Sequence, residues 1–282
     1  MIQETGTHML SKAYADHYQE GDYYVDGILY CGKCHTKKQL SHSLFGRDIF
    51  VGCLCECQAK ERAAEKAAEN KAAAEKQLAK LKNAAFPDPK LRNYRFDRDD
   101  GKNPLVSQMC KNYVKHFKDM EEQHEGLLLF GPVGTGKTFL AVAIANALLD
   151  EGVSCCVTNF TRLTNTLFAL RDGKQEYLDS LNKYDLLVID DLGAERDTEY
   201  MIEQVSIIID SRYRSGKPLI VTTNLSPEEL KHPADKSRAR IYSRLLGMCI
   251  PVEVAGEDRR KIQLRDSYND YKRLLTGSPK KN

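Results

Sequence analysis

The sequence contains no apolar run long enough to cross a membrane. A membrane-spanning helix needs roughly 20 predominantly apolar residues, and no stretch of this chain approaches that length. The N-terminal segment MIQETGTHMLSKAYADHYQEGDYY has neither the basic start nor the apolar stretch of a signal peptide. We therefore expect a cytoplasmic protein that has no membrane partner.

The sequence also lacks an excess of charge of either sign. Its 282 residues include 42 Lys and Arg and 40 Asp and Glu, which gives a formal net charge of +2. A charge this small predicts no particular partner, so any nucleic acid would have to bind at a local patch. The hydrophobic content of 41% and the charged content of 29% are those of an ordinary soluble globular protein.

Cysteine, by contrast, is abundant. The chain has nine cysteines, which is many for the cytoplasm, where disulfides are rarely kept. Five of them fall within residues 31–57, and Cys31 and Cys34 have the C-x-x-C spacing of a zinc knuckle. Clustering of this kind favours a metal site over disulfide bridges.

Two further metal ligands are expected from the later cysteines of the cluster. Of Cys53, Cys55 and Cys57 we select Cys55 and Cys57, because this C-x-C pair directly precedes a predicted helix. Cys53 stays an alternative, and His35 and His42 are weaker candidates. Four thiolates would close a tetrahedral structural Zn²⁺ site and supply folding free energy that so small a segment lacks. The alternative is a set of reduced cysteines without metal.

Residues 58–85 consist almost entirely of strong helix formers. Leu78 and Leu81 are their only large apolar residues, which are too few for a coiled-coil seam. We predict a solvated spacer helix that ends at residues 86–89, where two prolines stop it. An electrostatic arm that contacts a partner is the alternative.

Helical and strand-like segments alternate from about residue 105 onward. Apolar, strand-like runs occur at residues 127–130, 154–158, 186–189 and 219–222, and helical patterns separate them; another precedes them at residues 105–124. Such alternation predicts an α/β domain with a mostly parallel sheet that has helices on both faces.

A glycine-rich loop follows the first of these strands. It fits the pattern G-x-x-x-x-G-K-[ST] without a mismatch and opens a predicted helix. Glycines allow backbone N–H groups to surround phosphate oxygens, Lys137 is expected to reach the β- and γ-phosphates of ATP, and Thr138 to bind Mg²⁺. The predicted nucleotide-binding residues are Gly131, Pro132, Val133, Gly134, Thr135, Gly136, Lys137 and Thr138.

The second half of the expected site follows the strand at residues 186–189. Four large apolar residues lead directly into Asp190 and Asp191, and ligands of open α/β sheets bind at the carboxyl ends of strands. We predict that Asp190 binds Mg²⁺, directly or through water, and that Asp191 orients or deprotonates the attacking water. A pair of helix-capping aspartates is the alternative.

Asn224 lies just beyond the strand at residues 219–222. At such a strand end its side chain could hydrogen-bond the γ-phosphate or the attacking water. A simple turn is the alternative.

These motifs resemble those of AAA+ ATPases, with Asn224 at the sensor 1 position. More narrowly, the chain resembles bacterial and phage replicative helicase loaders of the DnaC/DnaI type and the related IstB-like transposition ATPases. A cysteine-bearing N-terminal region, an Ala/Lys/Glu helix, a Phe-Pro linker and a compact ATPase domain follow in the same order. The resemblance implies ATP-dependent loading of the replicative hexameric DNA helicase onto single-stranded DNA during replication initiation.

The same resemblance implies how the regions are used. We expect a zinc-binding, helicase-interacting module at residues 1–57, a helical linker at 58–104, an AAA+ ATPase domain at 105–275 and a tail at 276–282. The ATPase domain is expected to self-associate. The alternatives are a transposition helper, which usually lacks a cysteine module, and a nucleotide switch with negligible hydrolysis.

Two arginines near residue 240 resemble the arginine finger of loaders, which reaches the nucleotide of a neighbouring subunit. Arg244 fits that role best and Arg240 is the substitute. An arginine of this kind stabilises charge that develops on the transferred phosphoryl group. A solvated basic helix face is the alternative.

Residues 256–260 resemble the Gly-x-Ser-x-Arg pattern of IstB-like proteins, which places Arg260 at the sensor 2 position. Asp258 replaces the usual serine, and Arg259 could serve instead. A further departure is Asp191, where AAA+ proteins commonly have glutamate. A shorter acid could slow hydrolysis, which would suit a switch more than a motor.

Aromatic and basic residues alternate after the strand at 154–158, with Phe160, Arg162, Phe168 and Arg171. Aromatic rings stack on bases and arginines neutralise phosphates, so Arg162 and Arg171 are candidates for a DNA surface. By their spacing alone the two phenylalanines are expected to pack in the core.

Overall fold

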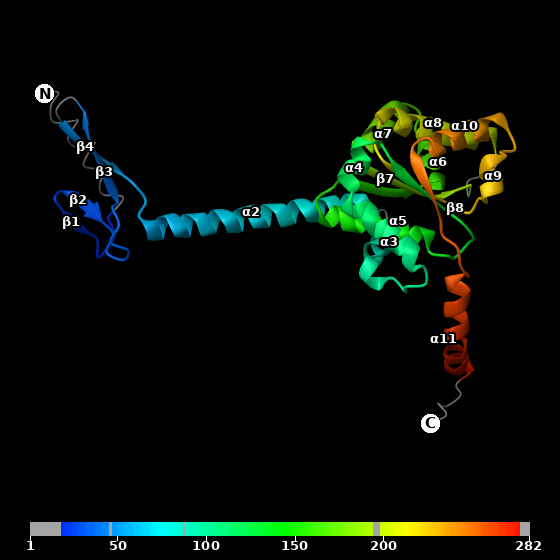
Figure 1. Cartoon of the computed structure of the whole chain (residues 1–282), viewed down its shortest axis with the longest axis horizontal. Helices are drawn as coiled ribbons and strands as arrows, with labels where there is room; N and C mark the ends of the chain where they lie inside the picture. Colours follow the sequence, from blue (N-terminus) through cyan, green and yellow to red (C-terminus); the bar gives the residue numbers. More distant parts are fainter. Residues whose placement is uncertain (1–17, 45–46, 87, 194–197, 277–282) are drawn as a thin grey trace. The chain divides into compact units, whose positions relative to one another are not determined.

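The computed structural model describes residues 18–44, 47–86, 88–193 and 198–276 (Figure 1). Most of the predicted tail, and residues 1–17 of the predicted N-terminal module, lie outside this part. The chain divides between Lys76 and Gln77 into two compact units. This division falls inside the long helix α2 (Glu56–Ala85), so the domain boundaries that we expect at residues 57 and 104 stay predictions.

The first unit contains two short hairpins. Strand β1 (Tyr23–Val25) pairs antiparallel with β2 (Ile28–Tyr30), and β3 (Gln39–Leu44) pairs antiparallel with β4 (Arg47–Gly52). The turn of the first hairpin is Asp26-Gly27, whose φ angles of 48° and 78° are those that a tight hairpin turn requires.

A buried ion pair anchors the segment that carries the first cysteines. The Nζ of Lys38 lies 2.5 Å from Oδ2 of Asp22, and their side chains are only 1% and 3% exposed. Oδ1 of Asp22 accepts the N–H of Gly32 at 3.0 Å. A Cβ on Gly32 would come within 2.0 Å of the carbonyl oxygen of Gly21. Glycine between the two cysteines is therefore required for space.

Helix α2 agrees with the helix expected at residues 58–85. Alanine, glutamate and lysine supply its propensity, and Ala85 is the single residue of the helix that is buried. The helix ends where Phe86, which is 4% exposed, enters the core of the second unit.

The second unit is built on a five-stranded sheet in the order β6-β7-β8-β5-β9. All four pairings are parallel, and the predicted α/β fold is confirmed. The fifth strand was not expected from the sequence. The strands are β5 (Gly126–Phe130), β6 (Cys155–Asn159), β7 (Leu186–Leu192), β8 (Leu219–Thr223) and β9 (Cys249–Glu253).

Helices follow or precede each strand of this sheet. The segment at residues 105–124 forms two helices and not one, because the chain leaves helical geometry at His116, where φ is −108° and ψ is 23°. Two short 3₁₀ turns, η1 (Pro89–Asn93) and η2 (Phe96–Arg98), precede them. The helices are α3 (Pro104–Lys115), α4 (Phe117–Glu122), α5 (Lys137–Asp150), α6 (Phe160–Ala169), α7 (Lys174–Asn182), α8 (Glu199–Ser215), α9 (Pro227–Lys231), α10 (Lys236–Leu246) and α11 (Arg259–Thr276).

The sheet has an apolar cluster on each face. In β7, Leu186 and Val188 belong to the cluster that α3, α4 and α5 cover, whereas Leu187 and Ile189 belong to the one that α6, α7, α8 and α10 cover. Successive side chains of a strand point to opposite faces, so a continuous apolar run fills both clusters. Burial on both faces holds β7 in place, and with it the acidic residues at its carboxyl end.

Candidate nucleotide and zinc sites

The glycine-rich loop connects β5 to α5. Gly131 and Gly136 have φ angles of 138° and 101°, a region that glycine reaches without steric cost. A Cβ on Gly131 would also lie 2.6 Å from the carbonyl oxygen of Val254. The motif therefore has glycine where the backbone conformation and the available space both require it.

Lys137 is the first residue of α5 and is only 5% exposed. Its Nζ donates to the carbonyl oxygens of Gly131 and Pro132, at 2.8 and 2.7 Å. Burial lowers the pKa of Lys137, and the carboxylates of Asp191 and Asp190 oppose that shift. The ammonium is thus held on the loop by neutral carbonyls, and a phosphate oxygen would be a stronger, charge-assisted partner.

Asp190 lies between two hydroxyl donors. Thr138 donates to its Oδ1 and Oδ2 at 2.9 and 3.1 Å, and Thr222 of β8 donates to Oδ1. Burial raises the pKa of Asp190, against the effect of these hydrogen bonds. A carboxylate beside a hydroxyl is a set of hard oxygen donors, which fits Mg²⁺.

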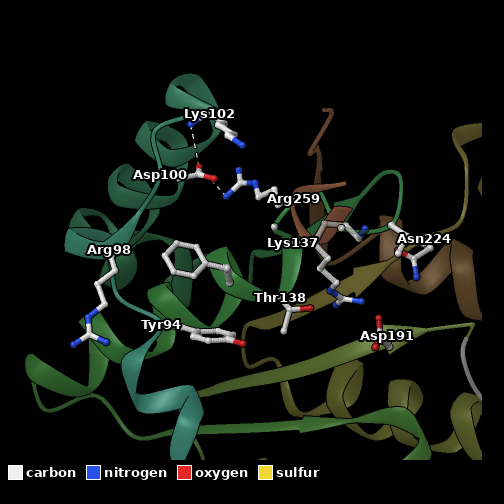
Figure 2. A pocket seen from close by; sticks show the side chains of 14 residues that line it. Tyr94, Arg98, Asp100, Lys102, Lys137, Thr138, Asp191, Asn224 and Arg259 are labelled. Atoms are coloured by element: carbon white, nitrogen blue, oxygen red, sulfur yellow. Dashed lines mark hydrogen bonds and ion pairs between the residues drawn. The ribbon is translucent and has the colours of Figure 1, made fainter. Parts of the chain in front are cut away.

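Asp191 lies in a bulge at the end of β7. The register between β7 and β8 shifts between Ile189 and Leu192, and Asp191 has a φ of 57°. Its N–H donates to Oγ1 of Thr222 at 3.0 Å. The bulge separates the two acids: Asp190 contacts Thr138, whereas Asp191 is exposed at the cleft, where Figure 2 shows it on the side of Asn224.

A cleft of about 660 Å³ opens beside the loop, within the size range of small-molecule sites. Residues of the loop, Asp191, Asn224 and Arg260 all line this cleft, and Figure 2 shows Lys137, Thr138, Asp191 and Asn224 around it. The predicted residues that line the cleft are Val133, Gly134, Gly136, Lys137, Thr138, Asp191, Asn224 and Arg260.

One wall of the cleft comes from the segment that was expected to be only a linker. Tyr94, Arg98, Asp100 and Lys102 line it together with Phe139, and the rings of Tyr94 and Phe139 lie 5.6 Å apart. These residues were not predicted from the sequence. The available signal was the run YRFDRDDGK at 94–102, which concentrates aromatic and charged residues before the first helix of the ATPase region.

A side chain of α5 holds this wall in place. Nδ2 of Asn146, itself 2% exposed, donates to the carbonyl oxygens of Leu91 and Tyr94 at 3.0 and 2.8 Å. Asp150 at the end of α5 pairs with Arg95 and with Lys82. The segment is therefore a fixed part of the second unit.

The start of α11 also meets the cleft. Asp258 caps the helix, because its Oδ1 accepts the N–H of Arg260 at 3.0 Å. The N–H of Arg259 donates to the carbonyl oxygen of Gly134 at 3.0 Å, and its Nη1 lies 3.0 Å from Oδ1 of Asp100. Both arginines line the cleft, so the choice of Arg260 over Arg259 as sensor 2 stays a prediction.

Arg244 and Arg240 lie on α10, and both pair with Asp210 of α8. The distance from Nη2 of Arg240 to Oδ2 of Asp210 is 3.1 Å. Neither arginine is among the described residues that line the cleft of their own chain. An arginine finger acts across an interface between subunits, so its assignment to Arg244 stays a prediction.

The first unit gathers four cysteines. The Sγ atoms of Cys31, Cys34, Cys55 and Cys57 all lie within 4.8 Å of one another. The hydroxyl of Thr36 lies 3.0 Å from Sγ of Cys34 and contributes most to lowering the pKa of that thiol, to about 5. Four soft sulfur donors at these separations fit a tetrahedral Zn²⁺, whose Zn–S bonds are about 2.3 Å long.

The other candidate ligands lie elsewhere in the first unit. Sγ of Cys53 is 3.4 Å from the carbonyl oxygen of Lys37. Nδ1 of His35 is 3.1 Å from the hydroxyl of Tyr23, and His42 lies on β3. Among the described residues, the cluster consists of the four cysteines that the sequence analysis selected.

The expectation that both phenylalanines of α6 pack in the core is wrong for Phe168. Phe160 is buried, but Phe168 is 69% exposed and packs edge-on against Tyr200. The apolar face of the helix consists of Phe160, Leu163 and Leu167, and position 168 lies outside that face because a helix repeats every 3.6 residues. Arg162 lines a groove of about 640 Å³ whose wall also includes Asp191.

The chain has relatives of known sequence. The chain matches the IstB-like ATP binding protein family over residues 50–267. The replicative helicase loader DnaI of Bacillus subtilis (strain 168) is 30% identical over 179 residues, which cover 58% of each chain. The replicative helicase loader DnaC of Escherichia coli (strain K12) is 30% identical over 145 residues, which cover 49% of this chain and 56% of DnaC. The chain thus spans little more than half the length of these relatives.

Solved structures give the same relationship. The crystal structure of DnaI has a TM-score of 0.51 at 26% identity, over 62% of this chain and 95% of that one. The crystal structure of the DnaC helicase loader has a TM-score of 0.50 at 27% identity, over 60% of this chain and all of that one. Among the described residues, no helix has the length and apolar character needed to span a bilayer. Because the family match extends over well over half of the sequence, the chain belongs to the IstB-like ATP binding proteins.

Proposed function

We propose that this protein is an ATP-dependent loader that places the replicative hexameric DNA helicase on single-stranded DNA during replication initiation. The observation that carries the proposal is a phosphate-binding loop and an acidic strand end at one cleft, in a chain related to two replicative helicase loaders. In this proposal residues 105–275 act as the ATPase, and residues 1–57 bind the helicase.

The cleft residues divide the work on ATP between binding and hydrolysis. Lys137 would exchange its carbonyl acceptors for β- and γ-phosphate oxygens. Thr138 and Asp190 would hold Mg²⁺, which supplies positive charge to the phosphates. Asp191 would accept a hydrogen bond from the attacking water, and Asn224 would donate one to the γ-phosphate.

Arginines outside the cleft support self-association through the ATPase region. Arg244 and Arg240 share the single carboxylate of Asp210. Asp210 therefore keeps one arginine partner if the other arginine moves away. We propose that Arg244 reaches the nucleotide of a neighbouring copy and stabilises transition-state charge there.

The remaining regions fit the recognition steps of a loader. We propose that zinc at Cys31, Cys34, Cys55 and Cys57 stabilises the first unit, which then binds the helicase. Single-stranded DNA would contact the surface of α6 near Arg162, together with Arg171.

Two experiments test the function. The full chain should co-purify with a replicative hexameric helicase, and a chain without residues 1–85 should not. Lys137→Ala should reduce ATP affinity by about 100-fold, because a charge-assisted contact to the phosphates is lost. Full ATP affinity in Lys137→Ala would exclude the nucleotide site, and helicase binding by the truncated chain would exclude the assigned module.

A comparison of turnover separates the loader from a nucleotide switch. Hydrolysis of ATP with single-stranded DNA should fall by about 100-fold or more in Asp191→Asn, while ATP binding is kept. Equal, negligible turnover in both proteins would indicate a switch. Binding to a transposase and duplex DNA, with no binding to helicase, would instead indicate a transposition helper.

A further inference from the structure

The nucleotide cleft contains an acid that the proposed chemistry does not use. Asp191 has a role in hydrolysis, but Asp100 lies on the opposite wall. A carboxylate near a triphosphate repels it, so its presence needs a separate explanation. The charged residues that line the cleft are Arg98, Lys102, Lys137, Arg259 and Arg260, and the acids Asp100 and Asp191.

Asp100 is held in one orientation by two donors. Its Oδ1 accepts the backbone N–H of Lys102 at 3.1 Å and lies 3.0 Å from Nη1 of Arg259, as Figure 2 shows. Nearby, Nδ2 of Asn103 donates to the carbonyl oxygen of Ala255 at 2.8 Å. The segment before α3 is therefore joined to the start of α11 beside the cleft.

The guanidinium that Asp100 holds also lies against the phosphate-binding loop. A Cβ built on Gly136 would be 2.8 Å from Cζ of Arg259, and the backbone N–H of Arg259 donates to the carbonyl oxygen of Gly134 at 3.0 Å. A triphosphate on this loop would thus offer the same guanidinium a second anionic partner, whose geometry suits bidentate contact.

Exposure indicates which partner Arg259 prefers when nucleotide is present. The side chains of Arg259 and Asp100 are 19% and 37% exposed, and ion pairs this accessible to water contribute little. A triphosphate carries several negative charges and sits inside the cleft. The ion pair is therefore weak enough to exchange.

We propose that Asp100 is a positioning residue that competes with the triphosphate for Arg259: it holds the arginine at the empty cleft and yields it when ATP binds. This inference rests on the proposed nucleotide site. It assigns Arg259 to the phosphates in addition to Arg260. It also makes Asp100 a residue that lowers ATP affinity, in contrast to the basic residues of the cleft.

The test measures ATP affinity of the full chain by calorimetry with Mg²⁺ present. Asp100→Asn should bind ATP about two- to fivefold more tightly, the factor that an ion pair of this exposure is worth. Asp100→Glu, which keeps the charge, should bind like the native chain. Asp97→Asn is the matched control, because it removes the same charge from an exposed position outside the cleft lining, and it should leave affinity unchanged. Weaker or equal binding by Asp100→Asn would overturn the proposal.

A double-mutant cycle of Asp100 and Arg259 measures how far the effect of Asp100 depends on Arg259. In an Arg259→Gln background, Asp100→Asn should give less tightening than in the native background, because the competed side chain is absent. Equal tightening in both backgrounds would mean that Asp100 only repels the triphosphate. Lys137→Ala distinguishes the two levels of inference. If it binds ATP normally, the nucleotide site itself is wrong; if it loses ATP while Asp100→Asn shows no gain, only the competition is wrong.

Discussion

Different interactions stabilise the two units of the molecule. Among the described residues of the first unit, the buried apolar side chains are Leu29, Cys31 and Cys55, and Tyr24 and Val51 are more than half exposed. The second unit buries an apolar cluster on each face of its sheet. A segment with so little apolar burial needs cross-links to fold. The comparison therefore predicts that polar and metal contacts dominate the stability of the first unit, and apolar packing that of the second.

The largest expected effect is the loss of metal from the first unit. Chelation, or Cys55→Ser, should unfold residues 18–57 and leave the second unit folded, because a structural zinc site supplies on the order of 10 kcal/mol. Hydrogen exchange should then show lost protection in β1 to β4 and unchanged protection in β5 and β8.

The chain contains a matched control for this change. Cys53 belongs to the same cysteine run, but its sulfur lies outside the cluster. Cys53→Ser should keep stoichiometric zinc and native protection. Loss of zinc from Cys53→Ser and its retention in Cys55→Ser would contradict the assigned ligands.

The next effect concerns a buried charge of the second unit. Arg212 is fully buried and donates to the carbonyl oxygens of Tyr184, Asp185 and Pro218. Burial lowers its pKa to about 10, so it stays charged at neutral pH. Arg212→Met should lower the free energy of unfolding by about 3–5 kcal/mol, because three carbonyls lose a charged donor.

Urea unfolding of the second unit measures this effect. Arg214→Met is the control, because Arg214 is exposed on the same helix, and it should change stability by less than about 0.5 kcal/mol. Similar losses in the two variants would show that the buried hydrogen bonds do not matter.

A smaller loss is expected from the ion pair of the first unit. Burial alone would raise the pKa of Asp22, but hydrogen bonds from Lys38 and from backbone amides outweigh it and hold the pKa below its usual value. Asp22→Asn leaves the ammonium of Lys38 hidden without a counter-ion. Few apolar side chains are buried in the described part of this unit, so the expected cost is only about 1–3 kcal/mol. Asp26→Asn, in a turn that accepts either residue, should be neutral in the same thermal unfolding measurement.

The smallest effect tests the attachment of the linker to α5. Burial opposes ionisation of Asp150, but Lys82 and Arg95 hold its pKa below the ordinary value. A carboxyl with a lowered pKa stabilises the fold above its unfolded pKa, about 4, and loses that contribution as the pH falls through the folded value. Because the three side chains are about one-third exposed, Asp150→Asn should cost at most about 1 kcal/mol near pH 7.

The pH dependence provides the check for Asp150. Thermal unfolding of the native chain and of Asp150→Asn should differ near pH 7 and converge as the pH falls through the lowered folded-state pKa of Asp150, because its side chain is then neutral, as asparagine is. A difference that persists at the lower pH would mean that the carboxylate is not the stabilising group.

The sequence revealed those parts of the site that are contiguous in the chain. The loop at 131–138 and Asp190 each follow an apolar run of the sequence, so local pattern alone located them. Tyr94 could not be located in this way, because Asn146, 52 residues later, positions its backbone. Long-range hydrogen bonds of this kind leave no periodic trace in the sequence.

Strand β9 was not predicted from the sequence for a different reason. It is an edge strand that contains Pro251, and only Cys249 and Val252 among its residues are buried. Proline is tolerated at a sheet edge but argues against a strand in a sequence pattern. Strand β7 was predicted, because burial on both faces makes its apolar run continuous, but the expected range of 186–189 ends three residues before Leu192.

The backbone at Asp191 restricts which acid can follow Asp190. With a φ of 57°, the position favours aspartate or asparagine, whose short side chains tolerate the left-handed region, over glutamate. Asp191→Glu would therefore extend the carboxylate further but would strain the local backbone. The bulge at the end of β7 therefore restricts which residue can occupy position 191, whatever its chemical role.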